Sequence, residues 1–195
     1  MTDAVDALRA RIAALEADLE AALSDERSKL MFRLENGRAL FDAEVNRRHA
    51  ELRTSLRSYL GGASPLVVIT APFIYAMIVP LLLLDAALMV YQAICFRAYG
   101  IARVSRSDHI VFDRHRLQYL NSLQKLNCVY CSYANGLLAL AVEIAARTEA
   151  YWCPIKHSQR LPAAHRLYGD FAEYGDAEAF HARMRSLNDR PNAAS

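Results

Sequence analysis

Four side chains in the second half of this chain have the types and the spacing of zinc ligands. Cys128 and Cys131 are three positions apart, and Cys153 and His157 are four positions apart. Structural zinc sites take four sulfur or nitrogen donors in a tetrahedron, and such short intervals let both members of a pair reach one ion. We therefore predict that these four residues bind zinc, which we favour over an iron–sulfur cluster.

The stretch between the two pairs leaves alternatives to this site open. A twelve-residue helix over residues 137–148 would carry the chain about 18 Å along its axis, so the four ligands would converge only if residues 132–152 were irregular or if two chains contributed. An antiparallel hairpin would instead bring Cys153 and His157 toward other candidate ligands: His109, Asp113 and His115. Ordinary thiols and surface histidines are the remaining interpretation.

No motif of a recognised catalytic centre is present. His109 and Asp113 are one residue short of the interval in the histidine–aspartate dyad of glycerolipid acyltransferases, and neither G-x-S-x-G nor H-E-x-x-H occurs. A net charge of +2 gives no electrostatic match to nucleic acid. We predict a non-enzymatic interaction or scaffolding protein; the first alternative is a membrane-bound redox or metal-dependent enzyme that uses the four candidate zinc ligands.

A long apolar run must lie in a hydrophobic environment. Pro65–Phe96 contains one formal charge, Asp85. About 20 apolar residues cross a bilayer core as a helix, so 32 residues, about 48 Å of helix, exceed one upright span and fall short of two. Pro72 and Pro80 are candidate kinks, because proline removes a backbone donor and clashes with the preceding turn. The run predicts a tilted membrane span or a kinked re-entrant hairpin; a buried helix of a soluble bundle is the second alternative.

The flanks of this run bear on topology. Lysine and arginine occur four times between residues 47 and 57 and five times between 97 and 116. Positive charge marks the cytoplasmic side and attracts anionic lipid, so both flanks are expected in the cytoplasm. Four cysteines without a signal peptide favour the same reducing compartment.

Asp85 is the candidate functional residue within the apolar run. A carboxylate at bilayer depth is costly and usually faces a partner or water. It marks the interfacial end of a span, contacts a tyrosine or glutamine neighbour, or serves an ion or proton pathway. The sequence leaves these three roles open.

The residues before the apolar run have helical periodicity. From Val5, apolar residues recur at steps of three and four, as in a coiled-coil seam, although for under three heptads; they are Leu8, Ile12, Leu15 and Leu19. An ordinary amphipathic helix is the alternative. Asn36-Gly37 predicts a helix stop, after which a second helix runs from Phe41 to Gly61-Gly62. We expect this region to contact a partner helix or a second copy of the chain.

Helices are also expected after the apolar run. Asp113 is a favourable N-cap for a third helix, and Asn135-Gly136 predicts its interruption. A fourth helix over residues 137–148 has Glu143 and Arg147 in the order that forms an i,i+4 ion pair.

These elements predict an all-α chain in four parts. Residues 1–60 form amphipathic or coiled-coil helices, and 61–97 form the membrane anchor. Residues 98–160 form a helical module with the cysteine and histidine cluster, and 161–195 form a polar tail with a short amphipathic helix. Membrane lipid is the expected partner.

Two sequence runs carry a family resemblance. NCVYCSYANG (127–136) and ARTEAYWCPIKH (146–157), behind an apolar segment ending in YQAICF, resemble a group of uncharacterised bacterial membrane proteins. The resemblance covers about residues 59–157. It implies a bacterial inner-membrane setting with cytoplasmic soluble regions, and it implies no activity or cofactor.

Overall fold

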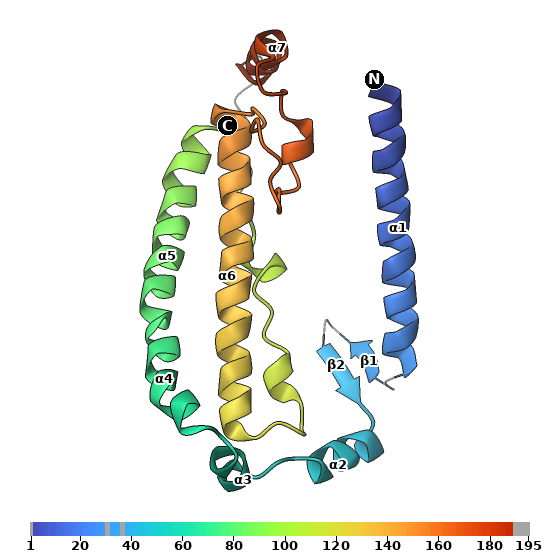
Figure 1. Ribbon diagram of the computed structural model, residues 1–195, viewed down its shortest axis with the longest axis vertical. Coiled ribbons are helices and arrows are strands. Elements are labelled where there is room, and N and C mark those ends of the chain that lie inside the picture. Colours follow the sequence, from blue (N-terminus) through green and yellow to red (C-terminus); the bar gives the residue numbers. More distant parts are fainter. Residues whose placement is uncertain (1, 30–31, 36–37, 189–195) are drawn as a thin grey trace. The chain divides into compact units, whose positions relative to one another are not determined.

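The computed structural model describes residues 2–29, 32–35 and 38–188, and these residues are mostly helical (Figure 1). The larger elements in chain order are α1 (Thr2–Lys29), β1 (Phe32–Glu35), β2 (Arg38–Phe41), α2 (Ala43–Glu51), α3 (Leu56–Gly61), α4 (Pro65–Ala76), α5 (Ile78–Tyr91), α6 (Ser122–Trp152) and α7 (Ala177–Asn188). The all-α prediction is confirmed, with one short β-hairpin added to it.

The chain forms two compact units. The first unit is Met1–Tyr59 with Asp113–Lys125, and the second unit is Leu60–Phe112 with Leu126–Ser195. The four-part division predicted from the sequence differs from this, because the anchor, the segment after it and most of α6 share one core. The polar tail belongs to that second unit as well.

The first unit begins with the predicted amphipathic helix. α1 runs without a break, and all its side chains from residue 10 to residue 25 are exposed. Leu8, Ile12, Leu15 and Leu19 are each more than half exposed. The apolar stripe of α1 is therefore uncovered by the described residues.

A hairpin lies between α1 and the predicted second helix, which it overlaps only at Phe41. β1 and β2 pair antiparallel, with Glu35 opposite Arg38. The predicted helix stop at Asn36-Gly37 lies outside the described residues.

The rest of the predicted second helix is divided into α2 and α3. The Ser55 hydroxyl accepts a hydrogen bond from the backbone N–H of Ser58 at 3.2 Å. This is N-cap geometry, so it stabilises a new helix start after the end of α2. The single helix predicted from Phe41 to Gly61-Gly62 is therefore wrong in its continuity.

The long helix α6 starts later than predicted. Asp113 precedes a single 3-10 turn (Arg114–Arg116) and its side chain caps nothing. Asn121 Oδ1 instead accepts from the Gln124 N–H at 2.9 Å, while Gln124 Oε1 accepts from the Asn121 N–H at 3.0 Å. This reciprocal capping box satisfies two backbone donors and sets the start of α6 at Ser122.

The second unit begins with the apolar run, which forms α4 and α5. They follow one another in one direction with a break at Met77, and a five-residue π-helical turn (Gln92–Phe96) ends the run. Pro80 explains the break, because its ring disturbs the carbonyl four residues earlier. The kink predicted at Pro80 is confirmed as this break, whereas Pro72 lies inside α4, which continues through it. The re-entrant hairpin is wrong, since the run does not fold back on itself.

α6 lies beside α4 and α5 and runs parallel to them (Figure 1). Near the start of the run the Tyr75 hydroxyl donates to Asn127 Oδ1 at 2.5 Å. Near its end the Tyr91 hydroxyl is 3.0 Å from that of Thr148. Residue numbers rise together along both helices, so the chain must return to the starting end between them.

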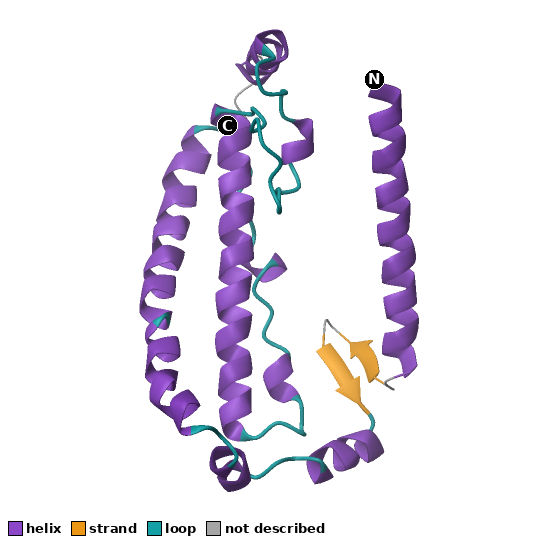
Figure 2. Cartoon of the chain, viewed as in Figure 1, coloured by secondary structure: helices purple, strands orange, loops and turns teal. Residues whose placement is uncertain are grey.

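Residues 97–112 make this return. Their backbone is mostly irregular, and most of it is drawn as loop in Figure 2. Arg147 Nη1 donates to the Ala102 carbonyl at 2.6 Å. Further along, Ile110 lies against Gly136. The segment is therefore antiparallel to α6, and we call residues 97–112 the return segment.

α6 is continuous through Asn135-Gly136, where an interruption was predicted. A β-carbon at position 136 would lie 2.7 Å from the His109 carbonyl oxygen and 2.8 Å from the Ile110 Cα. Glycine is thus required for close approach of the return segment. Asn135 donates its side-chain amide to the Cys131 carbonyl one turn earlier at 2.9 Å.

The core of the second unit joins all three of its parts. It consists of one residue from the end of the apolar run, two from the return segment and three from α6: Phe96, Val104, Ile110, Leu137, Leu140 and Ile144. Burial of such side chains contributes roughly 1.5–3 kcal/mol each. The return segment is therefore part of the core.

Residues 153–188 fold against the end of α6. Backbone hydrogen bonds pair two short stretches, with the Ala172 N–H donating to the Pro154 carbonyl at 2.9 Å and the Lys156 N–H donating to the Ala172 carbonyl at 2.8 Å. Phe171 is buried. α7 then provides the predicted short amphipathic helix. We call residues 153–176 the C-terminal cap.

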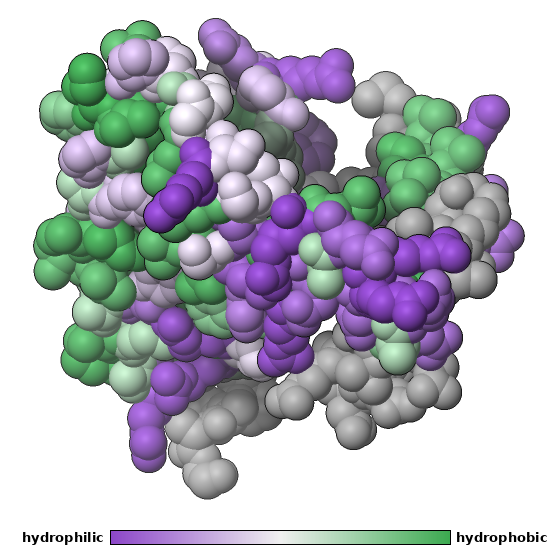
Figure 3. All heavy atoms as spheres, turned by 90° about the horizontal axis from the view of Figure 1, so that it is seen from below, coloured by the Kyte–Doolittle hydropathy of each residue, from purple (hydrophilic) through white to green (hydrophobic). Residues whose placement is uncertain are grey.

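Two helices among the described residues are long and apolar enough to cross a membrane: Pro65–Phe96, and Ser122–Trp152, which was predicted as two helices. The most apolar eighteen residues of the first have no buried member, whereas a third of those of the second are buried. In Figure 3, hydrophobic residues gather on the side of the second unit formed by α4 and α5. These features associate the chain with a membrane.

Candidate functional site

A buried carboxylate lies where the three parts of the second unit meet. Asp85 of α5 is 9% exposed. It forms an ion pair with Arg106 of the return segment, and its other oxygen accepts a hydrogen bond from the Tyr133 hydroxyl of α6 at 2.9 Å. A charge in apolar surroundings is tolerated when paired and hydrogen-bonded. Arg106 and Tyr133 are the partners that the sequence did not identify.

Local structure places each member of this network. Asp85 lies on the face of the apolar run that packs toward α6. The residues of this face recur at every third or fourth position, and they include Leu81, Leu88 and Gln92. Arg106 opens a 3-10 turn (Arg106–Asp108) in the return segment. The turn brings its guanidinium back to α5. The network therefore ties three chain segments together at one point.

Gln92 supplies a second polar contact two turns along α5. It is fully buried at the start of the π-helical turn, and its Oε1 accepts from the Val104 N–H at 2.7 Å. Its Nε2 has no hydrogen-bond partner among the described residues. A π-helical turn is rare and often occurs where a side chain must be re-aimed. Here it accompanies a buried glutamine that satisfies the irregular backbone of the return segment.

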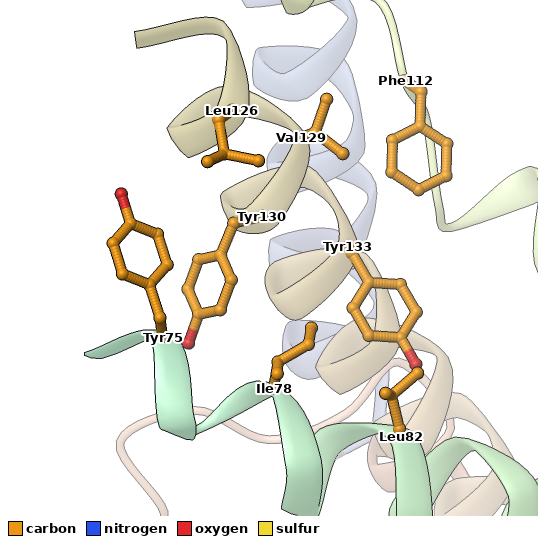
Figure 4. A pocket seen from close by; sticks show the side chains of 8 residues that line it. All are labelled: Tyr75, Ile78, Leu82, Phe112, Leu126, Val129, Tyr130 and Tyr133. Atoms are coloured by element: carbon orange, nitrogen blue, oxygen red, sulfur yellow. The ribbon is translucent and has the colours of Figure 1, made fainter. Parts of the chain in front are cut away.

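An apolar pocket of about 370 Å³ lies beside this network (Figure 4). Side chains of the apolar run, the end of the return segment and α6 line it: Tyr75, Ile78, Leu82, Phe112, Leu126, Val129, Tyr130 and Tyr133. Its three tyrosine hydroxyls are already engaged, with Asn127, with the Ile74 carbonyl at 2.8 Å and with Asp85. The walls thus offer hydrocarbon rather than hydrogen bonds.

The four predicted zinc ligands are not brought together within the chain. Cys128 and Cys131 lie on α6, and Cys153 and His157 follow the end of the same helix. Twenty-one helical residues lie between Cys131 and Cys153, so the rise from one to the other is about 33 Å. The described residues contain no group of three or more histidine, cysteine or acidic side chains placed to hold a metal. The zinc site stays a prediction that would require donors from two chains.

His157 has a different role in the described structure. Its backbone N–H donates to the Tyr168 hydroxyl at 2.6 Å, and its ring stacks on that of Tyr168 with centroids 6.2 Å apart. Both contacts lie within the C-terminal cap. His109 belongs to the return segment, and its Nδ1 lies 3.1 Å from the Ser105 carbonyl oxygen.

A charged cluster holds the C-terminal cap on α6. Arg147 pairs with Glu143 at 2.8 Å, which confirms the predicted i,i+4 pair, and Arg166 of the cap pairs with the same carboxylate at 2.5 Å. Hydrogen bonds and charge from Glu143 raise the pKa of Arg166 above its usual value. His165 adds a contact with Glu149 at 2.9 Å.

Aromatic side chains cluster where α6 ends. The Tyr99 and Tyr151 rings stack with centroids 5.2 Å apart, and Trp152 contacts both edge-on. Trp152 is 53% exposed. Exposed tryptophan and tyrosine are typical of a membrane–water interface.

Comparison with protein-family models, with curated proteins and with solved structures gave no match. The resemblance to a bacterial membrane family therefore stays a prediction.

Proposed function

We propose that this chain is a non-enzymatic, membrane-anchored interaction protein whose second unit is embedded in one side of the bilayer. The observation that carries the proposal is the parallel course of the apolar run and α6. A polar return segment leads from the end of the apolar run back toward the start of α6. If both helices crossed the bilayer, the return segment would also have to cross it. Irregular backbone at bilayer depth is tolerated only where protein or a water-filled cavity surrounds it.

The side chains of the return segment oppose such a crossing. Arg103, Ser105 and Asp108 are exposed, and Arg106 is partly exposed beside its carboxylate partner. A charge at the bilayer centre costs at least about 2.5–3.5 kcal/mol. A second unit lying along the interface keeps these groups in water while α4 and α5 face lipid.

This arrangement also explains why the apolar run has a length that fits neither one membrane span nor two. A helix in the plane of the interface has no length limit, whereas 32 residues match neither one upright span nor two. Large side chains on α4 and α5 are exposed along the run, among them Ile69, Phe73 and Leu83. Contact with acyl chains would remove them from water.

The bacterial inner membrane, with both termini in the cytoplasm, is the location we propose. Arginines flanking the run would then meet the anionic cytoplasmic leaflet. The enzymatic alternative has no supporting geometry, because the four cysteine and histidine candidates are dispersed. A soluble bundle would leave the apolar surface of α4 and α5 in water.

Epitope tags at the two ends of the full chain test the topology. In sealed inverted vesicles, protease should remove both tags, and in right-side-out vesicles it should remove neither. Two crossing helices joined by a crossing return segment would put the tags on opposite sides, which would overturn the proposal.

Substitution of an exposed leucine tests the anchor itself. Leu83→Asp, at 67% exposure on α5, should shift the protein toward the supernatant after alkaline extraction of membranes. Leu52→Asp is the matched control, since Leu52 is 73% exposed but lies in the first unit. Equal behaviour of the two variants would contradict anchoring by α4 and α5.

A further inference from the structure

We propose that α1 pairs with the α1 helix of a second copy as a parallel, in-register coiled coil. The stripe from Leu8 to Leu19 continues from Val5 to Ala22, so that six successive a and d positions are apolar. The described residues leave it exposed, with Leu8, Ile12, Leu15 and Leu19 between 57% and 61% exposed. This proposal does not depend on how the second unit meets the membrane.

The residue types on the stripe favour two parallel strands. Val5, Ile12 and Leu19 fall at a positions, and Leu8 and Leu15 fall at d positions. β-branched residues at a with leucine at d favour a parallel dimer, because their side-chain directions fit the two kinds of hole in that geometry; two of the three a residues, Val5 and Ile12, are β-branched. A second copy of α1 therefore fits this surface in both shape and type.

Charge complementarity selects the register. Arg11 falls at a g position and Glu16 at the e position of the next heptad, and both side chains are exposed. In a parallel, in-register pair, g of one helix approaches the following e of its partner. Arg11 of each copy would then meet Glu16 of the other, giving two attractive pairs by symmetry.

Charge also favours a protein partner over a lipid surface. Within Thr2–Lys29 there are seven acidic and four basic side chains, a net charge of −3. Helices that lie on membranes usually have a polar face rich in lysine and arginine, which anionic lipid attracts. α1 has the opposite balance, so anionic lipid would repel it.

Charge exchange in the full-length chain tests the pairing. We would measure the mass of the detergent-solubilised protein by light scattering over a range of concentrations. Wild type should dimerise, and Arg11→Glu or Glu16→Arg should each weaken dimerisation roughly tenfold, because two attractive pairs become repulsive. The double variant Arg11→Glu/Glu16→Arg should restore the wild-type dissociation constant.

Two further variants separate the seam from the rest of the helix. Leu15→Asp should abolish the dimer, whereas Glu20→Arg makes the same charge change as Glu16→Arg but at an outward b position, and should leave the dimer intact. A monomeric wild type, or a dimer insensitive to Leu15→Asp, would overturn the proposal. Failure of the double variant to recover would overturn the parallel register.

Discussion

Gly136 of α6 lies directly against the backbone of Ile110, with no room for a β-carbon between them. Each side of this contact depends on the other. The return segment can approach α6 this closely only at a residue without a side chain, which Gly136 provides. In turn, α6 continues through Asn135-Gly136 at the place where the return segment packs against it. The contact thereby joins residues 26 positions apart in the sequence.

Gly136→Ala should destabilise the second unit by about 1–2 kcal/mol. The substitution gains up to about 1 kcal/mol of helix propensity, but its β-carbon would lie 2.7–2.8 Å from backbone atoms of His109 and Ile110. Overpacking against backbone typically costs about 1–3 kcal/mol. Unfolding of the detergent-solubilised chain, followed by circular dichroism, measures the difference.

Gly61→Ala is the control for this experiment, because a β-carbon at position 61 has nothing within 4 Å. It should change stability by less than about 0.5 kcal/mol. A stabilised Gly136→Ala variant would show that the return segment does not press on α6.

The ion pair between Asp85 and Arg106 should be worth more than a surface pair. Arg106→Gln leaves a buried carboxylate without its cation, so we expect a loss of about 2–3 kcal/mol in unfolding free energy. Arg103→Gln removes an exposed arginine from the same segment and should have little effect. Unfolding of the two variants side by side checks this.

The double variant Asp85→Asn/Arg106→Gln distinguishes a direct pair from two separate effects. If the groups act on each other, the double variant should lose clearly less stability than the sum of the two single losses. Additive losses would mean that each side chain acts alone.

Local signals in the sequence predicted much of this fold. Periodicity located α1, the long stretch with a single charge located the apolar run, proline at position 80 predicted its break, and the i,i+4 order of Glu143 and Arg147 predicted their ion pair. These features depend on residues within one or two turns. The capping box of Asn121 and Gln124 was equally local, but Asp113 was preferred as the start of α6.

Long-range contacts account for what the sequence did not predict. Asn135-Gly136 is typical of a helix end, and only the approach of Ile110 explains why the helix continues. Arg106 and Tyr133 reach Asp85 because the chain returns along α6, which periodicity cannot show.

Zinc content is a direct test of the cysteine and histidine prediction. A rise of about 33 Å along α6 keeps Cys131 from Cys153 within one chain, so we expect purified protein to hold well under one zinc per chain. Elemental analysis of protein prepared without chelators measures this. One zinc per chain, lost in both Cys128→Ser and Cys153→Ser, would instead indicate sites shared between copies, because two copies that exchange their ligand pairs form two such sites.

Glu143 should hold the C-terminal cap on α6 through its two arginine partners. Glu143→Gln removes the charge that pairs with Arg147 and Arg166, so the cap should open more often and be cleaved roughly fivefold faster by protease. High salt should narrow the difference, because Arg166 is largely exposed. Glu173→Gln, whose carboxylate pairs with Lys156 at the surface, is the matched control and should be cleaved nearly as slowly as wild type. Equal cleavage of the two variants would mean that packing of Phe171, and not the charged cluster, secures the cap.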